Sequence, residues 1–130
     1  MSKIKSPKTD IRLDLKTRSS EKLCPIFSFE YMQKGYSVDD CEKKEKVALI
    51  SRLYKLSQMS WESIAQAQRH GLGWEKIERY SFYKPIPDLI TPDVRLIAFR
   101  FCGEAAMVGF RKDRIFHIVW LDRDFTLYRH

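Results

Sequence analysis

Residues 95–130, RLIAFRFCGEAAMVGFRKDRIFHIVWLDRDFTLYRH, decide the fold of this chain. They contain three runs rich in Ile, Val, Phe and Trp, which are separated by turn-like pairs at residues 102–103 and 112–113. Short β-branched and aromatic runs with two-residue breaks are typical of antiparallel hairpins. We therefore predict a β-meander, followed by a short fourth strand at residues 125–128.

The turns set the register of this meander. If residues 112–113 form a two-residue turn, Phe110 lies opposite Ile115; if residues 102–103 form another, Ile97 lies opposite Val108. Because side chains alternate with period two, a slip of one residue exchanges the two faces of the sheet. On this register one face is apolar and suits a core, whereas the other mixes arginine with aromatic rings. The first face holds Ile97, Phe99, Val108, Phe110, Ile115, His117, Val119 and Leu121, and the second holds Arg100, Met107, Gly109, Arg111, Arg114, Phe116 and Trp120.

Length and composition predict one globular domain. A chain of 130 residues with 44% hydrophobic residues can bury a core without disulfides or a metal. The three cysteines are odd in number and widely spaced, which favours reduced thiols in a cytosol over a disulfide framework. No apolar run reaches the length of a membrane span, so we expect a cytoplasmic protein that does not contact a membrane.

The net charge of +7 is unevenly distributed along the chain. Residues 1–22 hold seven Lys or Arg against three acids, residues 23–94 hold ten of each, and residues 95–130 hold seven against four. We predict a flexible basic arm at residues 1–22 and a single α+β domain at residues 23–130. A basic excess of this kind favours polyanionic partners, above all nucleic acid, although Lys-rich arms also serve solubility alone.

Upstream of the meander, the pattern predicts a strand and two helices. Residues 23–32 alternate as a strand with an aromatic face, at a sheet edge because Pro25 cannot donate to a ladder. Residues 37–57 are a helix capped by Ser37, and residues 61–69 are a second helix capped by Ser60. The apolar stripe of the longer helix consists of Val47, Ile50, Leu53 and Tyr54, widened by Leu49 and Leu56.

Residues 74–83 fit either a helical turn or an irregular loop, and three prolines enforce a non-helical connection after them. The predicted fold is thus α+β, in the order β-α-α-β-β-β. An antiparallel sheet, with the N-terminal strand beside the meander, packs on a helical hairpin.

This order of elements, together with a basic-aromatic final strand that ends in Tyr128 and His130, resembles the RelE/ParE superfamily of small bacterial toxins. The resemblance covers residues 23–130 in architecture, and this chain departs from it in its longer basic arm and its three-proline loop. It implies an RNA-binding protein that acts on ribosome-associated mRNA as a metal-independent endoribonuclease, with a small acidic antitoxin as protein partner. It also implies four catalytic positions: Arg100, Arg111, Tyr128 and His130.

Metal-independent RNA cleavage needs a base for the 2′-hydroxyl, an acid for the leaving oxygen and a cation at the phosphorane. Histidine suits either proton role, and the planar fork of arginine matches phosphate oxygens. On this interpretation Arg100 and Arg111 hold the phosphate, His130 moves a proton and Tyr128 donates or positions. The predicted nucleic-acid contacts are Lys112, Arg114, Phe116 and Trp120, with base stacking on the aromatic rings.

Three further residues are secondary candidates. His117 is expected in the core, hydrogen-bonded there, but a register slip would bring it among the arginines. His70 and Glu75 flank two glycines in a tight loop, which a helix C-cap explains equally.

We predict no metal site and no cofactor, because no paired His/Cys spacing, dinucleotide fingerprint or hydrolase motif is present. The alternatives to an endoribonuclease are a non-catalytic nucleic-acid-binding or regulatory module, and an interaction protein whose apolar second face a partner buries. The oligomeric state stays open.

Overall fold

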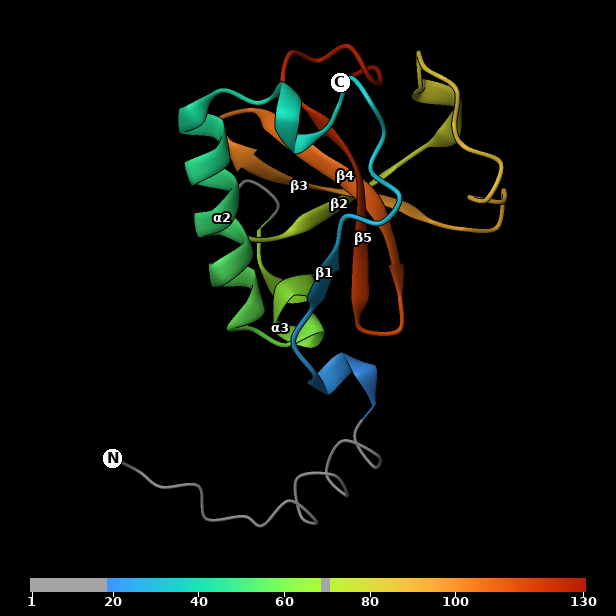
Figure 1. Cartoon of the computed structure of the whole chain (residues 1–130). Coiled ribbons are helices and arrows are strands. Elements are labelled where there is room, and N and C mark those ends of the chain that lie inside the picture. Colours follow the sequence, from blue (N-terminus) through green and yellow to red (C-terminus); the bar gives the residue numbers. More distant parts are fainter. Residues whose placement is uncertain (1–18, 69–70) are drawn as a thin grey trace, which may run out of the picture.

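A computed structural model describes residues 19–68 and 71–130, which form a mixed sheet with helices against it (Figure 1). The elements follow in the order β1 (Ile26–Ser28), α2 (Lys43–Ser57), α3 (Trp61–Gln66), β2 (Trp74–Ile77), β3 (Leu96–Cys102), β4 (Ala105–Lys112) and β5 (Ile115–Asp122). Three short 3-10 helices lie at Ser20–Lys22, Val38–Asp40 and Arg79–Ser81. The broad α+β class is as predicted. No helix within the described residues has the length and apolar character that a membrane span requires.

The sheet has five strands in the order β1-β5-β4-β3-β2. Strands β2 to β5 are antiparallel to their neighbours, but β1 pairs parallel with β5. The prediction of a purely antiparallel sheet is therefore wrong at this edge. A parallel neighbour needs a long connection, and here both helices and the other strands lie between the two partners in sequence. Residues 74–77, predicted to be part of a helical turn or an irregular loop, instead form β2 at the opposite edge of the sheet.

The two predicted helices exist with different ends and, for α2, a different buried stripe. Ser37 caps only the 3-10 helix at Val38–Asp40, and Glu42 begins α2 with a second capping box. Ser60 caps α3 as expected, but α3 ends at Gln66 rather than Arg69. Leu49, Leu56, Trp61 and Ile64 pack against the sheet, whereas Val47, Ile50 and Tyr54, predicted to face the core, are exposed on α2.

Both faces of the sheet are buried, which corrects the prediction of one open arginine-aromatic face. The helices cover one face, where Phe99, Met107, Phe116, Ile118 and Leu121 meet them. The connection between β2 and β3 and the C-terminal segment cover the other. The second layer consists of Ile77, Ile90, Leu96, Ala98, Ala106, Val108, Phe110, Val119, Trp120, Leu127 and Tyr128.

The register differs from the prediction because each turn falls one residue later. Cys102 pairs with Ala105 and Lys112 with Ile115, so Phe110 lies opposite His117 instead of Ile115. A register shift between Val108 and Gly109 then places Val119 and Trp120 in the same layer. Such a bulge lets two consecutive side chains share one face, which strict alternation forbids.

The predicted fourth strand at residues 125–128 is also wrong. Phe125 has a φ of 64°, which breaks any strand, and Tyr128 makes only an isolated bridge with Phe82. The segment after β5 is instead a tight turn that folds back beside the sheet. This turn shapes the candidate site.

Candidate active site

One surface pocket brings together three of the four predicted catalytic residues. Arg100 from β3 and Tyr128 and His130 from the C-terminal segment line it, together with the secondary candidate Glu75 from β2. The pocket measures about 130 Å³, and Ala98 and Ala106 form its floor. The two alanines leave space on this part of the sheet that larger side chains would fill. Residues far apart in the sequence therefore meet at one place.

Asp122, which no motif in the sequence singles out, organises this pocket. It ends β5, its side chain is fully buried, and one carboxylate oxygen accepts the backbone N–H groups of Thr126 (3.0 Å) and Leu127 (3.3 Å). The other oxygen lies 3.1 Å from Nε2 of His130. A buried carboxylate that holds one imidazole nitrogen fixes the tautomer and orientation of the ring. The other ring nitrogen, Nδ1, has no hydrogen bond to the described residues and is available for proton transfer.

Aromatic stacking holds the His130 ring as well. Its centroid lies 4.1 Å from that of Tyr128 in a stacked arrangement and 4.7 Å from that of Phe125 at a steep angle. The backbone N–H of Arg129 donates to the carbonyl of Ser81 at 2.8 Å. The side chain of His130 nevertheless stays 32% exposed, so a ligand can reach it.

Arg100 supplies a cation to the pocket, at present paired with Glu104. The side chain of Glu104 is 70% exposed, and an exposed ion pair of this kind contributes little free energy. A phosphate with two charged oxygens would compete well for the guanidinium. Binding would then require only that Glu104 turn outward.

Tyr128 is buried beside these groups, with its hydroxyl held in the protonated form. Burial, and then the negative charges of Glu75 and Asp122, raise the pKa of Tyr128 far above its usual value, while Arg100 opposes the shift. A phenol with a raised pKa remains a hydrogen-bond donor and does not act as a base. Its role in this pocket is therefore to donate or to support the His130 ring.

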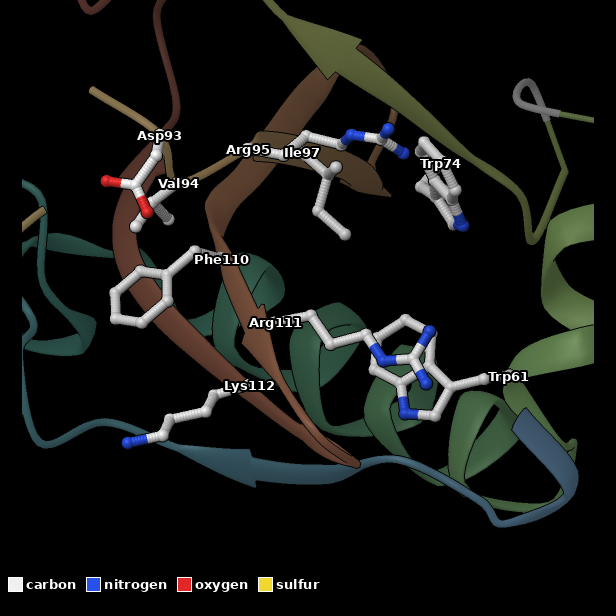
Figure 2. Close-up of a pocket in the computed structure, with 9 residues that line it drawn as sticks. All are labelled: Trp61, Trp74, Asp93, Val94, Arg95, Ile97, Phe110, Arg111 and Lys112. Atoms are coloured by element: carbon white, nitrogen blue, oxygen red, sulfur yellow. The ribbon is translucent and has the colours of Figure 1, made fainter. Parts of the chain in front are cut away.

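The fourth predicted catalytic residue, Arg111, lies elsewhere. It lines a larger pocket of about 390 Å³ with Lys112, and Figure 2 shows this pocket between α3, β2 and the ends of β3 and β4. The guanidinium of Arg111 lies 4.3 Å above the ring of Trp61. Arg100 and Arg111 thus serve two pockets and cannot grip one phosphate together, contrary to the sequence-based expectation.

Most of the other residues that were predicted to contact nucleic acid have structural roles. Phe116 and Trp120 are 0% and 2% exposed and pack in opposite layers, so neither ring offers a free face to a base. Arg114 donates to the carbonyl and the thiol of Cys24 at 3.0 and 3.1 Å, which ties β5 to the segment before β1. Of the predicted contacts, Lys112 alone is exposed.

His117 lies in the core, between the rings of Tyr31 (5.0 Å) and Phe110 (4.9 Å). Its Nδ1 has no hydrogen-bond partner among the described residues, so the prediction of a hydrogen-bonded core histidine is wrong for this nitrogen. The secondary candidate His70 lies outside the described residues.

We predict that His117 makes the stability of the protein fall in mild acid. Burial lowers the pKa of His117, with a smaller opposing effect of Glu30 and a smaller supporting effect of Lys112. The unfolded chain therefore binds this proton more readily than the folded protein. The contribution of neutral His117 to the free energy of unfolding is complete above the ordinary histidine pKa of about 6.5 and is lost as the pH falls below it. In thermal unfolding between pH 7.5 and 5.5, the midpoint of His117→Phe should change less than that of wild type. Equal slopes for the two proteins would contradict this role.

No three His, Cys, Asp or Glu side chains in residues 19–68 and 71–130 gather in a way that could hold a metal ion. Comparison of the chain with models of known protein families gave no match, and searches among curated proteins and among solved structures gave no significant match either. The resemblance to RelE/ParE toxins therefore stays a prediction from the sequence.

Proposed function

We propose that this protein binds RNA and cleaves it in a metal-independent reaction, as the ribonuclease members of the RelE/ParE superfamily do. The observation that carries the proposal is the contact between buried Asp122 and exposed His130 beside the cation of Arg100. An oriented imidazole next to a guanidinium supplies one of the two proton-transfer groups and the cation that cleavage of a phosphodiester requires.

The proposed reaction is attack of the 2′-hydroxyl on the adjacent phosphate. The oxygen–phosphorus bond to the next nucleotide breaks, and the products are a 2′,3′-cyclic phosphate and a 5′-hydroxyl. One proton leaves the 2′-hydroxyl and one reaches the departing oxygen. Glu75 and His130 line the same pocket and supply one carboxylate and one imidazole for these two transfers. Arg100 stabilises the charge of the phosphorane, and Tyr128 donates a hydrogen bond.

A cytoplasmic toxin-type role with mRNA on the ribosome as substrate, and with a small acidic protein as partner, belongs to the same proposal. The excess of basic residues at both ends of the chain supports a polyanionic substrate. The second candidate function is a non-catalytic nucleic-acid-binding module. The larger basic pocket favours it, because that pocket holds arginine and tryptophan but no histidine.

The test is cleavage by the purified full chain of matched free RNA and DNA strands in the presence of EDTA, and of mRNA on ribosomes in the Mg²⁺-containing buffer that ribosomes need. We expect RNA fragments with 2′,3′-cyclic phosphate ends, no DNA cleavage, and no cleavage where a single 2′-deoxy nucleotide replaces the attacking one. Intact RNA in both formats, together with normal growth of bacteria that express the protein, would refute catalysis and leave the binding module.

A further inference from the structure

We propose that the larger pocket, formed by Trp61, Trp74, Arg95, Arg111 and their neighbours, is a binding site for a nucleotide, recognised through its aromatic base and its phosphate. This nucleotide pocket is distinct from the pocket of His130. The proposal holds whether or not the protein cleaves RNA. The ligand is either a free nucleotide or one unit of a strand, which share this chemistry.

The nucleotide pocket has the size and the walls of a small-molecule site. Its volume of about 390 Å³ falls within the range of about 300–1,000 Å³ that is usual for ligand pockets. Phe110, Val94 and Ile97 join the two tryptophans in its lining. The indole N–H of Trp61 donates to the carbonyl of Arg114 at 3.1 Å, so this ring is fixed before any ligand arrives.

One cation of the pocket is held rigidly. Arg111 lies over Trp61, its Nε donates to the carbonyl of Asp113 at 2.6 Å, and its Nη2 contacts Ser20 at 3.0 Å and Glu21 at 2.7 Å. Its Nη1 makes no hydrogen bond to the part of the chain that the structure describes. The guanidinium is thus fixed on three sides and presents its remaining edge, and a fixed donor loses little entropy when it binds phosphate.

Two further cations are without ion pairs in the described residues. Arg95 extends toward Trp74, with its guanidinium carbon 6.0 Å from the ring centroid, and Lys112 is exposed at the end of β4. Figure 2 shows the two arginine–tryptophan pairs on different sides of the pocket. Trp61 is 1% exposed beneath Arg111 and packs on Phe99 and Phe116, so it supports the arginine from below. The half-buried ring of Trp74 is the indole surface that a base can reach.

This combination selects the chemical class of the ligand. The lining holds three cations and one acid, Asp93. The carboxylate of Asp93 accepts a hydrogen bond from the Thr91 hydroxyl, and this bond is the main reason why the pKa of Asp93 is lowered. Arg111 is already paired with Glu21, but an apolar ligand would leave Arg95 and Lys112 unpaired, and inorganic phosphate would leave the ring of Trp74 unused. A nucleotide satisfies both, because stacking of a base on an aromatic ring contributes about 1–3 kcal/mol and guanidinium groups bind phosphate with charge-assisted hydrogen bonds.

The experiment is isothermal titration of the full chain with AMP, with adenosine, with inorganic phosphate and with the oligonucleotide rA6. Arg95→Gln is the main variant, because its side chain is exposed, lies over Trp74 and makes no hydrogen bond or ion pair with the described residues. Trp74→Leu removes the stacking surface and keeps an apolar side chain. Arg129→Gln makes the same charge change outside the pocket and is the matched control.

We expect AMP or rA6 to bind, adenosine and inorganic phosphate to bind at least tenfold more weakly than AMP, and Arg95→Gln and Trp74→Leu each to weaken binding about tenfold. If AMP binds as tightly as rA6, the ligand is a free nucleotide. If rA6 binds and AMP does not, the ligand is one unit of a strand. Absence of both, or equal affinities for Arg95→Gln and Arg129→Gln, overturns the proposal. The His130→Ala variant should bind like wild type, which separates this result from a failure of catalysis.

Discussion

Replacing His130 by alanine should lower the rate of RNA cleavage by about 10²–10⁴-fold, the usual contribution of a positioned acid or base. The side chain is partly exposed, but its loss leaves one oxygen of buried Asp122 without this partner and uncovers one face of Tyr128, so a modest loss of stability accompanies the loss of rate. Single-turnover cleavage of a defined RNA measures the effect, and circular dichroism shows that the fold is kept. Combined with Arg100→Ala, which removes the cation at the phosphate, the change should also abolish growth arrest on induced expression.

Two companion variants make this result specific. Lys84→Ala removes an exposed cation that lines neither of the two pockets lined by His130, and it should cleave at the wild-type rate. Asp122→Asn keeps an acceptor for Thr126 and Leu127 but turns an amide N–H toward Nε2, which favours the opposite tautomer of His130. It should therefore change the pH profile of cleavage as well as its rate. Full activity of His130→Ala would move the proposed reaction to another place on the protein.

Replacing Gly109 by alanine should destabilise the fold by about 3 kcal/mol, at the upper end of what overpacking typically costs. A Cβ atom at Gly109 would lie 1.8 Å from the carbonyl oxygen of His117 and 2.9 Å from its carbonyl carbon. Both are backbone atoms of β5, so no side-chain rotation relieves the clash. The bulge between β4 and β5 would have to open. Urea unfolding of wild type and variant gives the difference directly.

Gly71 provides the matched control for this change. A Cβ atom there would meet only the carbonyl oxygen of Gln68, at 3.5 Å, which is ordinary contact. Gly71→Ala should therefore unfold at nearly the urea concentration of wild type. If Gly109→Ala behaved the same way, the close approach of β4 to β5 at the bulge would be refuted.

The sequence predicted the strands of the meander but not their register, for a reason that lies in the turns. The pairs at residues 112–113 and 113–114 each combine one basic and one acidic residue, so their composition does not show which pair forms the turn. Asp113 and Gly103, with φ of 56° and 59°, each occupy the first central position of their turn, where hairpin turns need positive φ. Placing Asp113 second moves the partner of Phe110 by two residues, from His117 to Ile115.

The second layer was missed although its apolar residues are regularly spaced. Phe82, Ile86, Ile90 and Val94 recur every fourth residue, but the prolines between them exclude the helix that this spacing would otherwise indicate, so the segment looked like an open loop. Without that cover, arginine and aromatic residues on one strand resemble an open binding surface. This is why Trp120 was predicted at the surface, whereas Phe116 is buried on the opposite face, against Trp61 of α3.

The candidate site was predictable in part. Arg100, Tyr128 and His130 were predicted from their chemistry and from the resemblance to RelE/ParE toxins, and all three line one pocket. Asp122 was missed because a charged residue between an apolar strand and a turn is usually solvated. Its burial arises only from the way the chain folds back after β5.

The parallel pairing of β1 with β5 has a consequence for the order in which the chain folds. Strands β3, β4 and β5 are joined by two-residue turns and form local contacts, whereas β1 can pair only after most of the chain has been brought back to the edge of the sheet. Closing a loop of that length costs entropy before any hydrogen bond forms. We therefore expect the meander to belong to the folding nucleus and the three residues of β1 to dock late. This edge would also be the first to open in native-state hydrogen exchange.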